Sequence, residues 1–329
     1  MRIFSGIQPT GRKHLGNHIG AIRGYLEGQE RGDPAIFCIV DLHAISVAYD
    51  PAELRERVYD TAAMLLAAGL DPARCILFRQ SDVREHTELC WLISTVTAHG
   101  DLNRMHQFKE KSARQRELVS AGLFLYPVLQ AADVLAYDTD EVPVGDDQRQ
   151  HLELTRDIAE RFNERFGETL VVPRHRIPEI GARIMDLQTP DQKMSTTAAS
   201  EQGVVFLLDD EDTIVKKVKS SVTDSGRDVV RGPDKPGISN LIEVMAVVTE
   251  RTPEAVEGEF DGAGYGDFKA AAGEAIAAFL TPLRERYLEL RADEAALEHG
   301  LAEGAGKARA ISSATLARVR ERMGVGTPV

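Results

Sequence analysis

The segment GIQPTGRKHLGN occupies residues 6–17 and connects a short apolar run at Arg2–Ser5 to a helical pattern from about His18 to Arg31. A second apolar run follows at Ala35–Val40. Apolar runs of this length, bounded by turn residues, are typical of buried strands. The pattern therefore predicts a strand, a turn rich in glycine and polar residues, a helix and a second strand.

A further helix is predicted after the second strand. Asp50 is a suitable N-cap, Pro51 suits the first helical position, and Glu53 lies three residues after the cap. An Ala- and Leu-rich pattern continues to Gly69, and the apolar run Cys75–Phe78 predicts a third strand.

Short apolar strands alternate with helices in this half of the chain. This alternation predicts the α/β class, with a parallel sheet that has helices on both faces. Such sheets bind ligands beyond the carboxyl ends of their strands. We therefore expect the ligand site near Gly6–Asn17 and near Asp41–His43.

The strand signal nearly vanishes after about residue 200, which predicts an appended all-helical domain. Glycine and proline in Arg231–Gly237 indicate an internal loop. The amphipathic helices are predicted at about 210–221, 237–250, 265–292 and 305–324.

The composition indicates a folded cytoplasmic protein. The chain has 329 residues, of which 43% are hydrophobic, and no run of about 18 apolar residues suggests a membrane span. The start of the chain lacks a cationic region followed by an apolar stretch, so no signal peptide is expected. Cys38, Cys75 and Cys90 form no CxxC pair and are expected to pack as small hydrophobic residues.

The net charge of −13 counts against a general nucleic-acid-binding protein, because Lys and Arg supply such affinity by neutralising phosphates. Any RNA contact should therefore be local. Basic residues cluster at Arg104–Arg116 and at Lys216, Lys217 and Lys219, although such runs are equally typical of solvated helix faces.

Two segments carry candidate chemistry. In HLGN, Gly16 admits close approach by a flat ligand, and His14 and Asn17 place hydrogen-bond donors near a helix start, where phosphates bind. Histidine can also carry charge near neutral pH. In KMSTT, residues 193–197, Lys193 can offset charge on phosphates and Ser195 can donate a hydrogen bond. A capped glycine turn and a solvated polar loop would explain the same residues without any ligand.

HLGN near the N-terminus, paired with KMSTT about 180 residues later, resembles the two signatures of class I aminoacyl-tRNA synthetases. The segment YPVLQAADVLAYDTDEVPVGDDQRQHLELTRDIAERFN, residues 126–163, resembles the tryptophanyl-tRNA synthetase family nearly residue by residue. The same is true of SGIQPTG, IVDLHAI, FKEKSA, GARIM, KSSVTDS and KPGISNL. The resemblance covers the chain from about residue 2 to its last helix.

The resemblance implies a Rossmann-type, nucleotide-binding catalytic domain at 1–183, joined by a C-terminal helix at about 293–329, and a helical domain at 184–292 that begins with the KMSTT loop and reads the anticodon. It also implies a homodimer. The implied partners are ATP, L-tryptophan and tRNA(Trp), with Mg²⁺ accompanying ATP and no separate metal site in the protein.

The resemblance also assigns roles to individual residues. Asp133 should accept the indole N–H, Tyr126 and Gln148 should hold the ammonium and carboxylate ends, and Asp147 should bind the ribose. The whole tryptophan set is Phe4, Gln8, His43, Tyr126, Gln130, Asp133, Val142, Val144 and Gln148. The ATP set is Gln8, Thr10, Gly16, Asn17, Gly145, Asp147, Ile184, Lys193, Met194 and Ser195. The catalytic set is His14, Asn17, Lys111, Lys193 and Ser195. His99 and His151 are expected to be structural.

This chain departs from the family pattern at two positions. Thr196 stands where the family usually has a second lysine, and Gln130 stands where the family often has methionine. The spacing of Tyr126, Gln130 and Asp133 resembles the amino-acid pocket of tyrosyl-tRNA synthetases, so tyrosine stays open as a substrate. The sequence also leaves open a metabolic nucleotidylyltransferase, which shares an HxGH-like loop, and a paralogue without catalytic activity.

Overall fold

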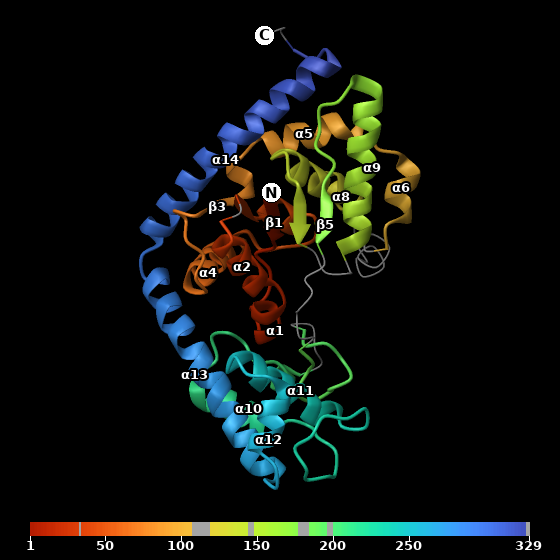
Figure 1. Cartoon of the computed structure of the whole chain (residues 1–329). Helices are drawn as coiled ribbons and strands as arrows, with labels where there is room; N and C mark the ends of the chain where they lie inside the picture. Colours follow the sequence, from red (N-terminus) through yellow and green to blue (C-terminus); the bar gives the residue numbers. More distant parts are fainter. Residues whose placement is uncertain (33, 107–118, 144–147, 177–183, 196–199, 327–329) are drawn as a thin grey trace. The chain divides into compact units, whose positions relative to one another are not determined.

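The computed structural model describes residues 1–32, 34–106, 119–143, 148–176, 184–195 and 200–326 (Figure 1). The chain forms two compact units. We call the first the sheet unit; it comprises Met1–Thr10, Glu27–Pro178 and Asp293–Val329. The second, the helical unit, comprises Gly11–Leu26 and Glu179–Ala292.

The sheet unit contains one parallel sheet whose order is β3-β2-β1-β4-β5. Its strands are β1 (Ile3–Ile7), β2 (Ala35–Ile39), β3 (Cys75–Arg79), β4 (Glu141–Pro143) and β5 (Arg174–Arg176). The order changes direction at β1, which pairs with both β2 and β4. In sheets of this kind the ligand site lies beyond the carboxyl ends of the strands at such a point. The predicted α/β class is confirmed. β4 and β5 were missed because each has only three residues.

Helices cover both faces of the sheet. Phe4, Cys38 and Phe78 belong to one large apolar core that also includes side chains of α5, α8, α9 and α14. Strand side chains alternate between faces, and α4 packs against β2. The helical elements of this unit are α2 (Arg23–Glu30, which begins in the helical unit), α3 (Asp41–Ala44), α4 (Pro51–Ala67), η2 (Gln80–Asp82), α5 (Glu85–Ser94), α6 (His99–Arg104), α8 (Ala121–Leu135), α9 (Arg149–Phe166) and α14 (Glu294–Met323).

The start of α4 is confirmed as predicted. The Asp50 carboxylate accepts a hydrogen bond of 2.8 Å from the backbone N–H of Glu53, and Pro51 occupies the first helical position. This cap satisfies one backbone donor that the helix leaves without an internal partner.

The last helix, α14, begins at Glu294, close to the bound of about 293 that the resemblance implies, whereas the periodicity predicted a start only at about 305. Gly300, Gly304 and Gly306 weaken the helical signal in its first half, since glycine is a poor helix former. α14 packs along β3, and Figure 1 shows it beside that strand. A Cβ added at Gly304 would lie 1.8 Å from the carbonyl oxygen of Leu77, so only glycine fits there.

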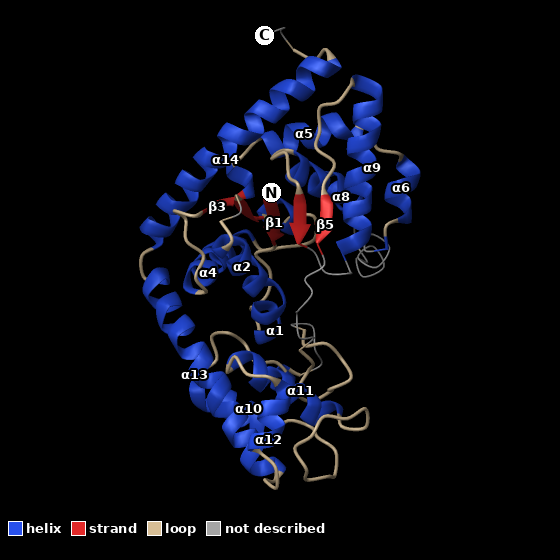
Figure 2. Cartoon of the chain, in the orientation of Figure 1, coloured by secondary structure: helices blue, strands red, loops and turns tan. Residues whose placement is uncertain are grey.

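Beyond residue 200 the described part of the chain contains helices and loops and no strand (Figure 2). α10 and α11 both pack against α13, and α12 packs against α11. The short helix α12 was missed, and α11 begins at Pro236, within the predicted loop. The helical elements of this unit are α1 (Leu15–Asn17), η1 (His18–Ile22), η4 (Glu201–Gly203), α10 (Glu211–Lys219), α11 (Pro236–Val248), α12 (Pro253–Glu259) and α13 (Tyr265–Arg291).

Cys38 and Cys75 are buried free thiols, as expected, whereas Cys90 is half-buried. In the described ranges, no helix combines the length and the apolar character that a membrane crossing requires.

Candidate active site

One face of α8 carries three of the predicted substrate-binding residues. Tyr126, Gln130 and Asp133 are spaced by four and three residues, which places them on the same side of a helix. Tyr126 and Asp133 are buried, and Gln130 is half-buried. Ser120 is the N-cap of this helix, and its hydroxyl accepts a hydrogen bond of 3.1 Å from the backbone N–H of Leu123.

Asp133 lies at the centre of a buried hydrogen-bond network. Its Oδ1 accepts from Gln80 Nε2 at 2.6 Å and lies 2.6 Å from His86 Nδ1, while its Oδ2 lies 2.7 Å from His43 Nε2. A carboxylate only accepts hydrogen bonds, so both ring nitrogens that face it carry protons. His43, Gln80 and His86 all come from segments that follow the carboxyl ends of β2 and β3.

The network keeps Asp133 charged. Burial raises the pKa of Asp133, but the interaction with His43 and the hydrogen bonds from His43 and His86 outweigh it and hold the pKa below its usual range. An ionised carboxylate with a relative exposure of 1% is therefore available as an acceptor. Sequence reasoning missed Gln80 and His86, although the position of Gln80 directly after β3 was a signal.

Two further contacts join α8 to α9. The Tyr126 hydroxyl lies 2.8 Å from His151 Nε2, and the Gln130 amide donates to Gln148 Oε1 at 3.4 Å. Burial raises the pKa of Tyr126, so the phenol stays protonated. The structure thus brings Tyr126, Gln130, Asp133 and Gln148 onto neighbouring faces, and His151 contacts the first of them.

The remaining tryptophan-binding predictions in the sheet unit lie on its strands or directly after them. Phe4 stacks on Tyr137 with ring centroids 5.6 Å apart, and both Phe4 and Val142 belong to the apolar core. Gln8 and Thr10 are exposed and follow β1. Their contacts with substrate stay predictions.

The HLGN segment belongs to the helical unit, although it follows β1 directly in sequence. The Leu15 N–H donates to the Val205 carbonyl at 2.9 Å, and the Leu207 N–H donates to the Lys13 carbonyl at 3.0 Å. Asn17 Oδ1 accepts from the His14 N–H at 3.0 Å. Asn17 therefore caps this turn, and the hydrogen bond fixes the orientation of its side-chain amide.

The KMSTT segment is held at its start by a short antiparallel pairing. Met185 and Lys193 form a bridge, and the Met194 N–H donates to the Ile184 carbonyl at 3.0 Å. Asn240 of α11 binds both the N–H and the carbonyl of Met185, at 2.9 and 3.1 Å. Lys193 is exposed while Ile184 and Met194 are buried.

His14 and Lys193 lie close enough to interact. Burial, followed by the positive charges of Lys193 and Lys13, lowers the pKa of His14 from 6.5 to about 4. His14 therefore does not use the ability of histidine to carry charge near neutral pH. The imidazole is neutral at pH 7 because both its surroundings and its cationic neighbours oppose protonation.

Gly16 lies beside the same histidine. A Cβ added at Gly16 would lie 3.1 Å from the His14 ring and 3.6 Å from Ile184 Cβ. A side chain at this position would therefore contact the His14 ring tightly, and the ring would have to shift by a few tenths of an ångström. The structure also brings together Gly16 and Ile184, two residues of the predicted ATP set.

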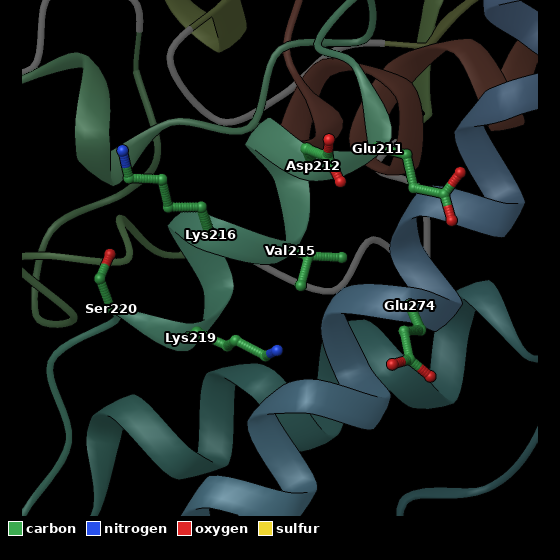
Figure 3. Close-up of a pocket in the computed structure, with 7 residues that line it drawn as sticks. All are labelled: Glu211, Asp212, Val215, Lys216, Lys219, Ser220 and Glu274. Carbon is green, nitrogen blue, oxygen red and sulfur yellow. The ribbon is translucent and has the colours of Figure 1, made fainter.

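The three clustered lysines of α10 differ in their surroundings. Lys217 is buried, and its ammonium donates to Asp209 Oδ2 at 2.6 Å and to the Val204 carbonyl at 2.8 Å. Lys216 and Lys219 are instead exposed, and they line an open hollow of about 650 Å³ together with Glu211, Asp212 and Glu274 (Figure 3). Lys217 is therefore a structural residue, which leaves the other two available to a partner.

Four of the predicted residues, Lys111, Val144, Gly145 and Asp147, lie outside the described residues, as does Thr196. Among the residues that the structure describes, no group of three or more His, Cys, Asp or Glu side chains could hold a metal ion.

Comparison with known proteins identifies the family to which the chain belongs. The family model for class I tRNA synthetases of the W and Y group matches residues 1–281. The chain is 47% identical over 324 residues to a tryptophan–tRNA ligase of Wolinella succinogenes, covering 98% of each protein. It is 50% identical over 332 residues to that of Leifsonia xyli subsp. xyli, covering 99% of this chain and 98% of the relative.

Solved structures of tryptophanyl-tRNA synthetases have a similar fold. Tryptophanyl-tRNA synthetase from Mycoplasma pneumoniae superposes with a TM-score of 0.88 at 34% identity, covering 99% of this chain and 98% of the other. The enzyme from Campylobacter jejuni, in complex with ADP and tryptophan, gives a TM-score of 0.86 at 35% identity, covering 99% of this chain and all of the other.

The parallel sheet and the two paired signatures are features of a nucleotide-binding ligase, and the chain belongs to the class I aminoacyl-tRNA synthetases. Within that class it falls among the bacterial tryptophanyl-tRNA synthetases.

Proposed function

We propose that this chain activates L-tryptophan with ATP, forming tryptophanyl-adenylate and pyrophosphate, and then transfers tryptophan to tRNA(Trp). The observation that carries the proposal is the buried, ionised Asp133, because the indole N–H is a donor and requires an acceptor. Relatives of almost the same length, at 47% and 50% identity, support the choice of tryptophan over tyrosine.

In the proposed tryptophan site, Asp133 accepts the indole N–H, and Tyr126 and Gln148 hold the ammonium and carboxylate ends. Phe4, Val142 and Val144 supply apolar walls. Gln8, His43 and Gln130 complete the site. The described contacts that support this arrangement are those of Asp133 with His43 and of Gln130 with Gln148.

In the proposed ATP site, Gly16, Ile184 and Met194 face adenine, and Asp147 binds the ribose hydroxyls. Gln8, Thr10 and Gly145 also contact the nucleotide. The groups proposed around the phosphates are His14, Asn17, Lys111, Lys193 and Ser195. The proximity of His14 to Lys193 and of Gly16 to Ile184 supports this grouping.

In the proposed reaction a tryptophan carboxylate oxygen attacks the α-phosphorus of ATP, and the bond from that phosphorus to the bridging oxygen breaks. Pyrophosphate leaves with the bond's electron pair. The Lys193 cation stabilises the leaving phosphates, and the neutral His14 and the Asn17 amide can donate hydrogen bonds without changing their charge. No proton has to be removed from the attacking carboxylate, so no general base is required.

Mg²⁺ is proposed to enter as part of the ATP complex, where it neutralises phosphate charge. The described side chains assigned to the triphosphate, His14, Asn17, Lys193 and Ser195, are neutral or cationic. Such groups suit phosphate oxygens, so the phosphates are expected to hold the metal.

We also propose a cytoplasmic homodimer, with a C-terminal anticodon-reading domain at 184–292 and a catalytic domain at 1–183 that the C-terminal helix joins. The helical unit of the structure differs from the first of these ranges by including Gly11–Leu26. Lys216 and Lys219 are exposed candidates for a local contact with tRNA.

The experiment that tests the proposed function is ATP–pyrophosphate exchange with each of the twenty amino acids. Tryptophan should support the fastest exchange. A preference for tyrosine would show instead that the chain is a tyrosyl-tRNA synthetase.

Asp133→Asn tests the residue that carries the proposal. Asparagine keeps the shape but loses the charge, so kcat/KM for tryptophan should fall by a factor that corresponds to about 1.5–3 kcal/mol, the usual range for a hydrogen bond to a charged group. Circular dichroism checks that the variant folds. An unchanged kcat/KM would remove Asp133 from the substrate site.

A further inference from the structure

The three donors around Asp133 do not share its two oxygens equally. Gln80 and His86 both bind Oδ1, and His43 binds Oδ2. A carboxylate offers about four acceptor positions, two on each oxygen. With the described donors in place, both positions on Oδ1 are used and one position remains on Oδ2, next to His43.

Each donor to Oδ1 is itself held in place. The Gln80 side-chain oxygen Oε1 accepts from the backbone N–H of Leu42 at 3.1 Å, which directs the side-chain NH₂ to Asp133. His86 Nε2 lies 2.6 Å from the Tyr137 hydroxyl, on the opposite side of the ring from Asp133. Gln80 and His86 are both 0% exposed.

These contacts prevent the carboxylate from turning about its terminal torsion. If it turned, the two donors on Oδ1 would lose their acceptors inside the protein, and a buried donor without a partner is costly. The remaining acceptor position is therefore kept on Oδ2.

We propose that Gln80 and His86 are positioning residues that set the selectivity for tryptophan, because they hold Asp133 with a single acceptor position left for the indole N–H. This inference rests on the proposed role of Asp133 as the indole acceptor. A held acceptor rejects a ligand that lacks the N–H, because the acceptor is then left unpaired. A carboxylate that can turn finds another partner, and the rejection weakens.

The test compares tryptophan with 3-(benzothiophen-3-yl)alanine, in which sulfur replaces the indole N–H and the ring shape is kept. The measured quantity is the ratio of kcat/KM for the two amino acids in ATP–pyrophosphate exchange. The ratio is insensitive to the fraction of folded enzyme, since both substrates are assayed with the same preparation. The wild type should prefer tryptophan by about 100-fold, in line with one hydrogen bond to a charged group.

Two variants remove one donor each. Gln80→Met and His86→Leu each replace the polar side chain by an apolar one of similar length or bulk. Each variant should lower the selectivity ratio by about tenfold, the size expected when a single buried polar contact is lost. His86→Asn is the conservative control, because an asparagine amide can place a donor near the position of Nδ1. It should keep the ratio within about threefold of the wild type.

The outcomes separate this inference from the proposed function. A wild-type ratio near one would show that Asp133 does not read the indole N–H, and both would fall. If the wild type discriminates and Asp133→Asn does not, but Gln80→Met and His86→Leu keep the wild-type ratio, the positioning role alone is overturned. Failure of His86→Asn to restore the ratio lost in His86→Leu would overturn the role of His86. Should His86→Leu fail to fold, Gln80→Met decides the test.

Discussion

The Lys193 side chain has a surrounding that suits a phosphate-binding cation. It is exposed, while its neighbours Ile184 and Met194 in the paired backbone are buried, and its charge acts on His14. A cation held at the base of an ordered pairing can stabilise charge that develops on leaving phosphates.

Replacement of this lysine should therefore affect the rate more than binding. Lys193→Ala should lower the rate of adenylate formation by roughly 100-fold or more while the Kd for tryptophan changes little. Single-turnover kinetics measures the rate, and equilibrium dialysis measures the Kd. Lys219→Ala, which removes an equal charge from α10, is the control and should leave the rate unchanged. An equal loss in both variants would contradict a specific role for Lys193.

His14 and His18 predict how stability depends on pH. Burial followed by nearby positive charge lowers the pKa of each from 6.5 to about 4, with Arg23 as the cation beside His18. Between these values the unfolded chain binds protons that the folded chain does not. The stability that is present above pH 6.5 is therefore lost as the pH falls toward 4.

The free energy of unfolding should thus fall by about 1.5 kcal/mol for each of these histidines between pH 6.5 and 5. Urea denaturation at the two pH values measures the loss. The variant that carries both His14→Gln and His18→Gln should show a flatter dependence. The same slope in wild type and variant would mean that other groups are responsible.

At the scale of elements, the contact between α14 and β3 joins the end of the chain to the edge of the sheet. Glu298 of α14 accepts hydrogen bonds from Arg79 of β3, the shorter at 2.8 Å, and one from Tyr59 of α4 at 3.0 Å. Gly304 permits this approach because its Cα faces the carbonyl oxygen of Leu77.

Gly304→Ala should separate the helix from the strand and lower the free energy of unfolding by about 1–3 kcal/mol or more, as overpacking against backbone does. Gly300→Ala and Gly306→Ala are matched controls in the same helix, since an added Cβ meets no described atom within 4 Å at either position. Both should stabilise the protein by about 0.5–1 kcal/mol, because alanine is the better helix former. Thermal denaturation distinguishes the three. A stabilised Gly304→Ala would contradict the close contact.

At the scale of the whole molecule, the charge of −13 limits how tRNA can bind. Since the protein as a whole repels phosphate, the attraction has to come from local cations such as Lys216 and Lys219, which line the hollow beside α10.

The Kd for tRNA should therefore depend on salt only modestly. The slope of log Kd against log salt concentration should fall by about one or two when Lys216 and Lys219 are both replaced by alanine, because each phosphate contact contributes a slope of nearly one. Filter binding from about 50 to 200 mM salt measures the slope. Amino-acid activation should barely change over the same range. If salt abolished activation and tRNA charging equally, a disrupted fold or dimer would be the better explanation.

The amino-acid sequence was sufficient to predict the α/β class, the cap of α4, the main helices after residue 200 and the resemblance to tryptophanyl-tRNA synthetases. These features depend on local patterns of apolar, capping and turn residues. It also identified Tyr126, Gln130 and Asp133 as one helical face, because their spacing follows the helical period.

The surroundings of those residues are visible only in the folded protein. Gln80 and His86 reach Asp133 across 53 and 47 positions of sequence, and Lys13–Leu15 binds a segment near residue 205 that places HLGN in the helical unit. His14 is neutral because folding buries it near Lys193, which is remote in the chain. Burial and long-range hydrogen bonds arise when distant segments meet, so no local pattern of residues records them.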